Sequence, residues 1–323
     1  MKTQLSLKKV KSENGNILKL GTNNLHWLTL RLNHFIPWQG DKINEAGIKA
    51  CAELALAYNH LKQWQNKSEG LALPLRDILP QWHTFLVQVC ENTAYSEMPR
   101  KNPAQAFNYL IPYFFLRGTG YRSSYHEATL RYLQKWGYPK TTEVIPFRQL
   151  DRQYVLWKSG LQKRLPNWIS LYANTTAACH RSSIYLDDAS VYSITHTLFY
   201  LTDFGGQTAP LSDSEVKRLI TTVESLLVHY WRCKNWDILG ELLINLLNLN
   251  CKESNLIADA SRTFREAAQE DGAIPANHTV QAQLASQSND ASRPDLEFSY
   301  CYHTTLVSLL YCSIALLSSY SNE

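Results

Sequence analysis

Hydrophobic and polar positions recur along most of the chain at the spacing of α-helices. Residues 41–64 are one example, in which Ala46, Ala50, Leu54 and Leu61 keep one side apolar. The same kind of pattern predicts further helices over residues 77–95, 104–116, 123–136, 146–162, 166–180, 190–204, 212–231, 235–250, 254–269 and 298–318. No segment shows the regular alternation of a convincing strand. We therefore predict an all-α protein.

The predicted helices are of two kinds, charged amphipathic helices and helices that are apolar nearly all round. Charged helices are expected at 146–162, 212–231 and 254–269, and apolar ones at 166–180, 190–204, 235–250 and 298–318. Because an apolar helix must be buried on all sides, this alternation indicates outer and inner helices. We predict a single α/α toroid, a double ring of about a dozen helices, with an α-solenoid as the alternative. The absence of a fixed-length repeat counts against the solenoid.

The N-terminal segment differs from the rest of the chain. Residues 1–24 are interpreted as a polar N-terminal arm, because Gly15 and Gly21 interrupt any helical pattern. Residues 25–323 are expected to form the all-helical, toroid-like domain. Two helix starts carry capping signals: Ser212 with Glu215 forms a capping box, and an Asp or the Ser of the segment Asp187-Asp188-Ala189-Ser190 is interpreted as a helix cap.

Composition excludes several classes of protein. The 323 residues are 45% hydrophobic with a net charge of +4, and no basic stripe indicates nucleic-acid binding. Seven cysteines without a CxxC pair are typical of free thiols in a reducing cytoplasm. Residues 304–322 form the longest uncharged run, but Ser and Tyr interrupt it, so a buried helix is expected there rather than a membrane span. With no signal-like N-terminus, the prediction is a cytoplasmic protein.

Histidines lie close to the expected starts of helices that carry His126, His196 and His303. In an α/α toroid the inner helices point the same way, so these side chains would converge on one mouth, where helix N-termini favour an anionic ligand. His196 shares one helix face with Tyr200 and Asp203, at the spacing i, i+4, i+7. The imidazoles would then shuttle protons or hold a metal; the alternative is buried histidines hydrogen-bonded to backbone.

The helix expected at 235–250 carries a polar stripe on an otherwise apolar surface. Asp237, Glu241, Asn245 and Asn248 are spaced by four, four and three residues, so they lie on one face. Burying a bare carboxylate is costly, so Glu241 needs a partner or a wet cavity. A Glu in a cavity of low dielectric would be a candidate general acid or base. A hydrogen-bonded contact with a neighbouring helix, or a solvent-facing stripe, is the alternative.

Four segments together resemble a known family: 146–152, 195–205, 239–243 and 302–307. They are similar to a bacterial family of all-helical proteins of unknown function, whose members occur near natural-product gene clusters. The resemblance covers roughly residues 100–315 and implies a cytoplasmic bacterial protein tied to secondary metabolism. Residues 269–275 are similar to the turns between helix pairs in α/α-toroid enzymes of the terpenoid-cyclase and lanthionine-cyclase kind, where they are structural.

These observations lead to a functional hypothesis of acid–base catalysis in a central cavity. The predicted catalytic residues are His196, His303, Glu241, Asp203 and Tyr200, and the predicted substrate-binding residues are Tyr302, Thr304, Asn245 and His126. The two imidazoles would transfer protons, with Asp203 orienting one of them and Glu241 as a second acid or base. No cofactor or nucleophile motif is present, so no cofactor is expected, and the reaction would be an elimination, cyclisation or isomerisation.

The expected substrate is a natural product or a peptide, which makes the protein a lyase or an isomerase (cyclase). The alternative is a non-catalytic helical module that binds a peptide or a partner biosynthetic enzyme. Cavity geometry discriminates between the two. A closed pocket that joins His196, Glu241 and His303 through hydrogen bonds would favour catalysis, whereas an open aromatic groove would favour binding.

Overall fold

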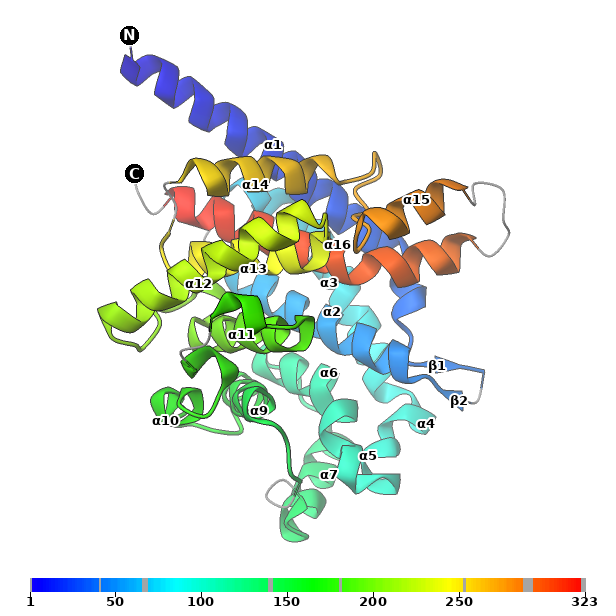
Figure 1. The fold of residues 1–323 in the computed structure, drawn as a ribbon. Coiled ribbons are helices and arrows are strands. Elements are labelled where there is room, and N and C mark those ends of the chain that lie inside the picture. Colours follow the sequence, from blue (N-terminus) through cyan, green and yellow to red (C-terminus); the bar gives the residue numbers. More distant parts are fainter. Residues whose placement is uncertain are drawn as a thin grey trace.

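The computed structural model describes residues 2–40, 42–65, 69–138, 142–179, 182–251, 254–286 and 293–320, and it confirms the all-α prediction (Figure 1). The α-helices are α1 (Lys2–Leu30), α2 (Glu45–Trp64), α3 (Glu69–Glu91), α4 (Thr93–Ser96), α5 (Met98–Lys101), α6 (Ala106–Gly118), α7 (Ser124–Lys135), α9 (Pro146–Lys158), α10 (Trp168–Tyr172), α11 (Asp188–Leu201), α12 (Asp213–Arg232), α13 (Trp236–Asn248), α14 (Asn255–Glu266), α15 (His278–Ser286) and α16 (Arg293–Tyr320).

Short elements join the helices. The 3₁₀ helices are η1 (Leu32–Phe35), η2 (Pro103–Gln105), η3 (Thr176–Ala178), η4 (Ser183–Tyr185) and η5 (Asp203–Gly205). Strands β1 (Trp38–Gln39) and β2 (Lys42–Ile43) pair antiparallel just before α2, a hairpin that the sequence pattern did not predict. Asp187 is the cap of α11, since its side chain accepts from the backbone N–H of Ser190. Ser212 caps α12 as expected, since its side chain accepts from the backbone N–H of Glu215.

Contacts between helices follow a circuit that returns to its start. α2 packs against α6, α6 against α9, α9 against α11, α11 against α13, α13 against α16, and α16 against α2. Other helices pack against members of this series: α1 against α16, α3 against α2 and α6, and α12 and α14 against α13. Apart from Leu247, every residue of α13 is buried, because neighbours cover it on all sides. The predicted buried helix at 235–250 is therefore confirmed.

Two sequence interpretations are corrected around α9. Residues 146–162 were expected to form an outer helix, but α9 contacts α6 and α11 and buries Leu150 and Tyr154, one turn apart. The segment 166–180, expected as a continuous apolar helix, forms only the short α10 and η3, with Ile169 of α10 exposed. The overall charge of a helix does not decide its position, since one apolar stripe is enough for it to pack between two neighbours.

The N-terminal segment also differs from the sequence interpretation. Residues 2–24 belong to the helix α1, and Ile17 and Leu20 are buried in the core that includes α16. Near the end of α1, Asn24 donates to the carbonyl of Gly272 and accepts from the Ser308 hydroxyl. This pairing ties α1 to the 269–275 turn and to α16. The domain division at residue 24 stays a prediction.

Helix α16 is long and apolar enough to cross a membrane, and within the described residues it alone meets that test. Its most apolar window is 78% buried inside the protein, where α1, α2, α13 and α15 cover it. The apolar surface of α16 is thus accounted for by packing within the fold. The helix also carries His303, which faces α2 and α13.

Candidate functional site

Acidic and imidazole side chains from five helices meet in one group, which we call the imidazole–carboxylate cluster. Its members are Glu53 of α2, Asp151 of α9, His196 of α11, Asp237 and Glu241 of α13, and His303 of α16. All five helices belong to the circuit of contacts described above. Elements distant in the sequence therefore supply a single site.

Glu241 occupies the centre of the cluster. Its Oε2 accepts a 2.5 Å hydrogen bond from Thr195 Oγ1 and lies 3.7 Å from His196 Nδ1, while its Oε1 lies 3.6 Å from His303 Nε2. The Glu241 side chain is 1% exposed, so burial alone would raise its pKa. The two imidazoles and the Thr195 hydroxyl outweigh burial and lower the pKa, which keeps Glu241 a carboxylate.

His303 is surrounded by carboxylates. Its Nδ1 lies 2.9 Å from Glu53 Oε2, and its Nε2 lies 3.4 Å from Asp237 Oδ1. Burial would lower the pKa of His303, but the facing carboxylates of Glu53 and Asp237 raise it well above the usual value. In turn the imidazolium lowers the pKa of Glu53 against the effect of burial. His303 is therefore a protonated imidazole at neutral pH.

Asp237 stands one helical turn before Glu241, and the two carboxyl groups repel each other. Tyr192 donates a 2.6 Å hydrogen bond to Asp237 Oδ2, and Thr304 donates a 3.2 Å bond to Oδ1. Burial, with Glu241 adding to it, raises the pKa of Asp237 although His303 acts in the opposite direction. Of the two carboxyl groups on α13, Asp237 is thus the more readily protonated.

His196 has a fixed orientation. Its Nδ1 lies 2.8 Å from the backbone carbonyl of Tyr192, and since a carbonyl only accepts, Nδ1 carries the hydrogen in the neutral ring. Nε2 is then the basic nitrogen. The side chains of His196 and His303 are 23% and 25% exposed, whereas that of Glu241 is 1% exposed. The cluster therefore combines imidazoles that reach solvent with a carboxylate that does not.

Asp151 adds a further carboxyl group beside His196. Burial raises its pKa, although Arg148 at 3.2 Å, His196 and a hydrogen bond from Tyr200 oppose that effect. The Tyr200 hydroxyl has its own pKa raised well above the usual value, first by burial and then by Asp151. Tyr200 thus serves as a hydrogen-bond donor to a cluster member.

Several of the residues predicted from the sequence lie together. His196, Glu241 and His303 are joined as described, Thr304 bonds Asp237, and Tyr302 is hydrogen-bonded to Glu53. The sequence reasoning missed Glu53 and Asp151. α2 begins at Glu45, and Glu53 is the one further carboxylate within this alanine-rich helix, which was an available signal.

Three predicted residues lie elsewhere. Asp203 follows the end of α11 at Leu201, so the i+7 spacing no longer applies, and its partners are Tyr154 Oη at 2.7 Å and Lys158 Nζ at 2.9 Å. Asn245 lies one turn beyond Glu241, fully buried. His126, on α7, stacks on Tyr113 and has Ser123 Oγ 3.0 Å from its Nδ1. None of these contacts involves the cluster.

The Asp203 contacts form a second buried polar group. Tyr154 Oη also lies 3.0 Å from His60 Nε2, and the Lys158 and Asp203 side chains are 9% and 13% exposed. Burial, with the positive charge of Lys158 adding to it, lowers the pKa of His60 well below the usual value, so this imidazole is neutral. The group joins α2 and α9 to the turn after α11, a structural role.

Metal binding was the open alternative for the histidines. Throughout the part of the chain that the structure describes, no three or more His, Cys, Asp and Glu side chains are arranged to hold a metal ion. The carboxylates around His303 are placed as ion-pair partners of an imidazolium.

Fold and cluster together define an all-helical protein whose polar interior joins imidazoles to buried carboxylates. The chain belongs to the family described as domain of unknown function (DUF6895), whose model matches residues 21–313. The family model thus begins about 80 residues closer to the N-terminus than the segment, roughly residues 100–315, over which the sequence was seen to resemble a known family. No curated protein and no solved structure matches the chain.

Proposed function

We propose that the protein is an enzyme that carries out acid–base chemistry on a small natural product or a peptide at the imidazole–carboxylate cluster. The observation that carries the proposal is the position of Glu241. Its buried carboxylate lies 3.7 Å from one imidazole and 3.6 Å from the other, so His196 and His303 are coupled through a single group. Such a constellation is costly to bury, and catalytic sites are where it recurs.

The two imidazoles are suited to opposite roles. His196 presents Nε2 as a base, because the Tyr192 carbonyl holds the hydrogen on Nδ1. His303 is protonated, because Glu53 and Asp237 raise its pKa, and so it can donate a proton. One proton would leave the substrate for His196, and another would pass from His303 to a second substrate atom or a leaving group. Glu241 would balance the charge as the imidazolium moves from one ring to the other.

Reactions of this kind need no oxidant, nucleophile or added cofactor. A proton shift gives an isomerisation, protonation followed by ring closure and proton loss gives a cyclisation, and loss of a proton with a leaving group gives an elimination. The protein would therefore be a lyase or an isomerase (cyclase). We place it in the bacterial cytoplasm, acting on a soluble small molecule or peptide in secondary metabolism, without nucleic acid or membrane as partner.

We further propose that the helices form an α/α toroid. The circuit of contacts through α2, α6, α9, α11, α13 and α16 supports it, as does the origin of all cluster residues in that series. In such a ring the series is the inner layer and the cluster lines its interior. An experimental structure in which any neighbouring pair of these helices is separated would contradict the arrangement.

The function is tested by deleting the gene in the bacterium that carries it and then restoring it with wild-type or variant copies. Deletion of the gene, followed by untargeted metabolite profiling against the parent, reveals the compound that accumulates or disappears. We expect wild type and an Asp259→Asn variant, altered in an exposed ion pair, to restore the parental profile. His303→Gln and Glu241→Gln, expressed at equal levels, should not restore it. If both cluster variants restore the profile, acid–base catalysis is wrong and the alternative of a binding module, for a peptide or a partner biosynthetic enzyme, is favoured.

A further inference from the structure

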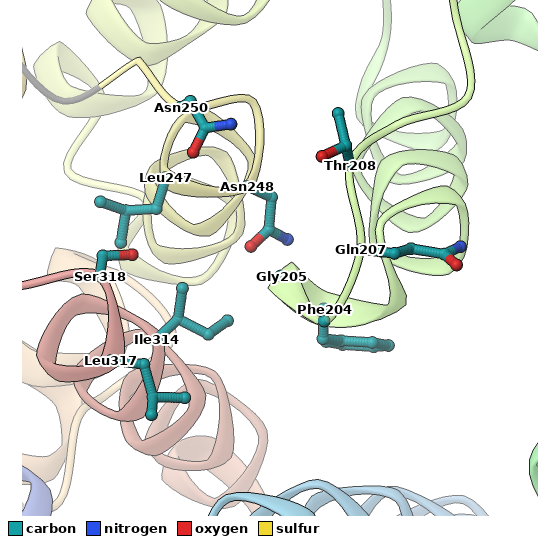
Figure 2. Close-up of a pocket in the computed structure, with 11 residues that line it drawn as sticks. Phe204, Gly205, Gln207, Thr208, Leu247, Asn248, Asn250, Ile314, Leu317 and Ser318 are labelled. Carbon is teal, nitrogen blue, oxygen red and sulfur yellow. The ribbon is translucent and has the colours of Figure 1, made fainter. Parts of the chain in front are cut away.

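A cavity of about 280 Å³ lies at the C-terminal ends of α13 and α16, next to the turn that follows α11 (Figure 2). Its walls include Phe204, Gln207, Thr208, Leu247, Asn248 and Ile314. No member of the imidazole–carboxylate cluster lines it. The cavity is therefore a separate feature, and nothing in the proposed acid–base chemistry uses it.

Asn248 supplies a buried amide to the lining of this cavity. Its residue surface is 6% exposed, and within the described residues neither Oδ1 nor Nδ2 has a hydrogen-bond partner. Figure 2 shows the amide directed from α13 toward Gly205 and the space between the helix and the turn. A buried amide without partners is energetically unfavourable, so a ligand that pairs with both atoms would be stabilised there.

The lining residues limit the chemistry of the ligand. None of the described residues that line the cavity is Asp, Glu, Lys, Arg or His, so no side chain would neutralise a charged ligand. Leu247, Ile314 and Phe204 provide apolar walls, and the neutral polar side chains of the lining are Gln207, Thr208, Asn248, Asn250 and Ser318. The volume is at the small end for ligand pockets. These properties fit a small, neutral molecule that has both an apolar part and hydrogen-bonding groups.

The wall formed by the turn is held in place. Asp203, Phe204 and Gly205 have φ values of 47°, 51° and 89°, a left-handed conformation that costs free energy at the two non-glycine positions. Asp203 is fixed in this conformation by its bonds with Tyr154 and Lys158. The second buried polar group therefore shapes one wall of the cavity before any ligand binds.

We propose that this cavity binds a small neutral molecule that carries a carboxamide. The ligand carbonyl would accept from Asn248 Nδ2, and the ligand N–H would donate to Asn248 Oδ1. The apolar remainder of the ligand would pack against Leu247 and Ile314. A paired donor and acceptor on one rigid group is what an amide offers, and what an ester or a hydrocarbon of the same size lacks.

Benzamide is a suitable probe, and methyl benzoate is its matched control without the N–H donors. Ligand-observed NMR titration of the full chain should give saturable benzamide binding and weaker binding of methyl benzoate. In Asn248→Leu, loss of two neutral hydrogen bonds should weaken benzamide binding by about tenfold or more. Asn245→Leu removes another buried, unpartnered amide of α13 that lies outside the cavity lining, so its Kd should equal that of wild type.

Circular dichroism establishes that each variant is folded. If Asn248→Leu does not fold, Thr208→Trp replaces it, because Thr208 is an exposed residue at the rim of the cavity and a tryptophan there should obstruct entry and weaken benzamide binding. The proposal is overturned if benzamide does not bind wild type. Equal binding of benzamide and methyl benzoate, or undiminished binding of benzamide to a folded Asn248→Leu or Thr208→Trp variant, would overturn it as well.

Discussion

Glu241 of α13 and His303 of α16 face each other with Oε1 and Nε2 3.6 Å apart, and neither group has an ordinary pKa. The carboxylate is buried and the imidazole is a quarter exposed. Each charged form is stabilised by the other, because a lone charge in this interior would be strongly unfavourable. The pair therefore links the packing of α13 on α16 to the protonation state of the cluster.

The Glu241→Gln variant removes one charge of this pair and leaves the shape of the side chain nearly unchanged. We expect the free energy of unfolding to fall by about 2 kcal/mol, since His303 keeps Glu53 and Asp237 as partners but loses its most buried carboxylate. Urea unfolding at neutral pH measures the difference. Asp259→Asn, which breaks an exposed pair with Arg262, is the control and should cost less than about 1 kcal/mol. Equal losses in the two variants would contradict the prediction.

Stability should fall at alkaline pH because of His303. Its pKa in the folded protein is raised well above the usual value of about 6.5, so between these two pKa values the folded state binds the proton and the unfolded state does not. The stabilisation is fully present below about pH 6.5 and is lost as pH rises through the folded pKa. His303→Gln should abolish this loss in urea titrations at increasing pH. His229→Gln, at an exposed position on α12, should keep the wild-type dependence.

His126 should act at the other end of the pH range. Burial lowers the pKa of His126 to about 4 in the folded protein. Between about pH 6.5 and pH 4 the imidazole is therefore protonated in the unfolded chain but not in the folded protein. Between these values the protein should lose about 3 kcal/mol as pH falls, and His126→Gln should lose correspondingly less. Urea unfolding at steps across this range compares the two slopes. Parallel slopes would show that His126 is protonated without cost in the folded state.

The sequence predicted those parts of the site that lie within one helix. Asp237 and Glu241 are on one face of α13 because helical periodicity holds from its first to its last residue. Asp203 shows where this reasoning ends, because the helix stops at Leu201 and the chain turns with positive φ. A spacing that is counted across the end of a helix therefore does not predict in which direction the side chain points.

Partners from other helices could not be derived from spacing. Glu53 and Asp151 reach His303 and His196 only because the circuit of helices brings α2 and α9 to the same interior. No local pattern in the sequence shows that α2 and α9 lie next to the helices of His303 and His196. Asp151 was harder to predict as a site residue because the charged composition of its helix indicated an outer position.

Gly240, the residue before Glu241, sets how closely α14 and α16 approach α13. A Cβ at this position would lie 2.7 Å from Phe264 Cζ and 2.8 Å from Val307 Cγ1, both closer than a packed core allows. We expect Gly240→Ala to destabilise the protein by about 1–3 kcal/mol although alanine favours helices.

Gly15→Ala in α1 is the matched control, because nothing lies within 4 Å of a Cβ there. It should gain up to about 1 kcal/mol from helix propensity alone. Thermal and urea unfolding of the two variants should therefore shift in opposite directions. A stabilised Gly240→Ala variant would mean that α14 and α16 can move away from α13 without cost, and the close packing that positions His303 against Glu241 would then not be required for the fold.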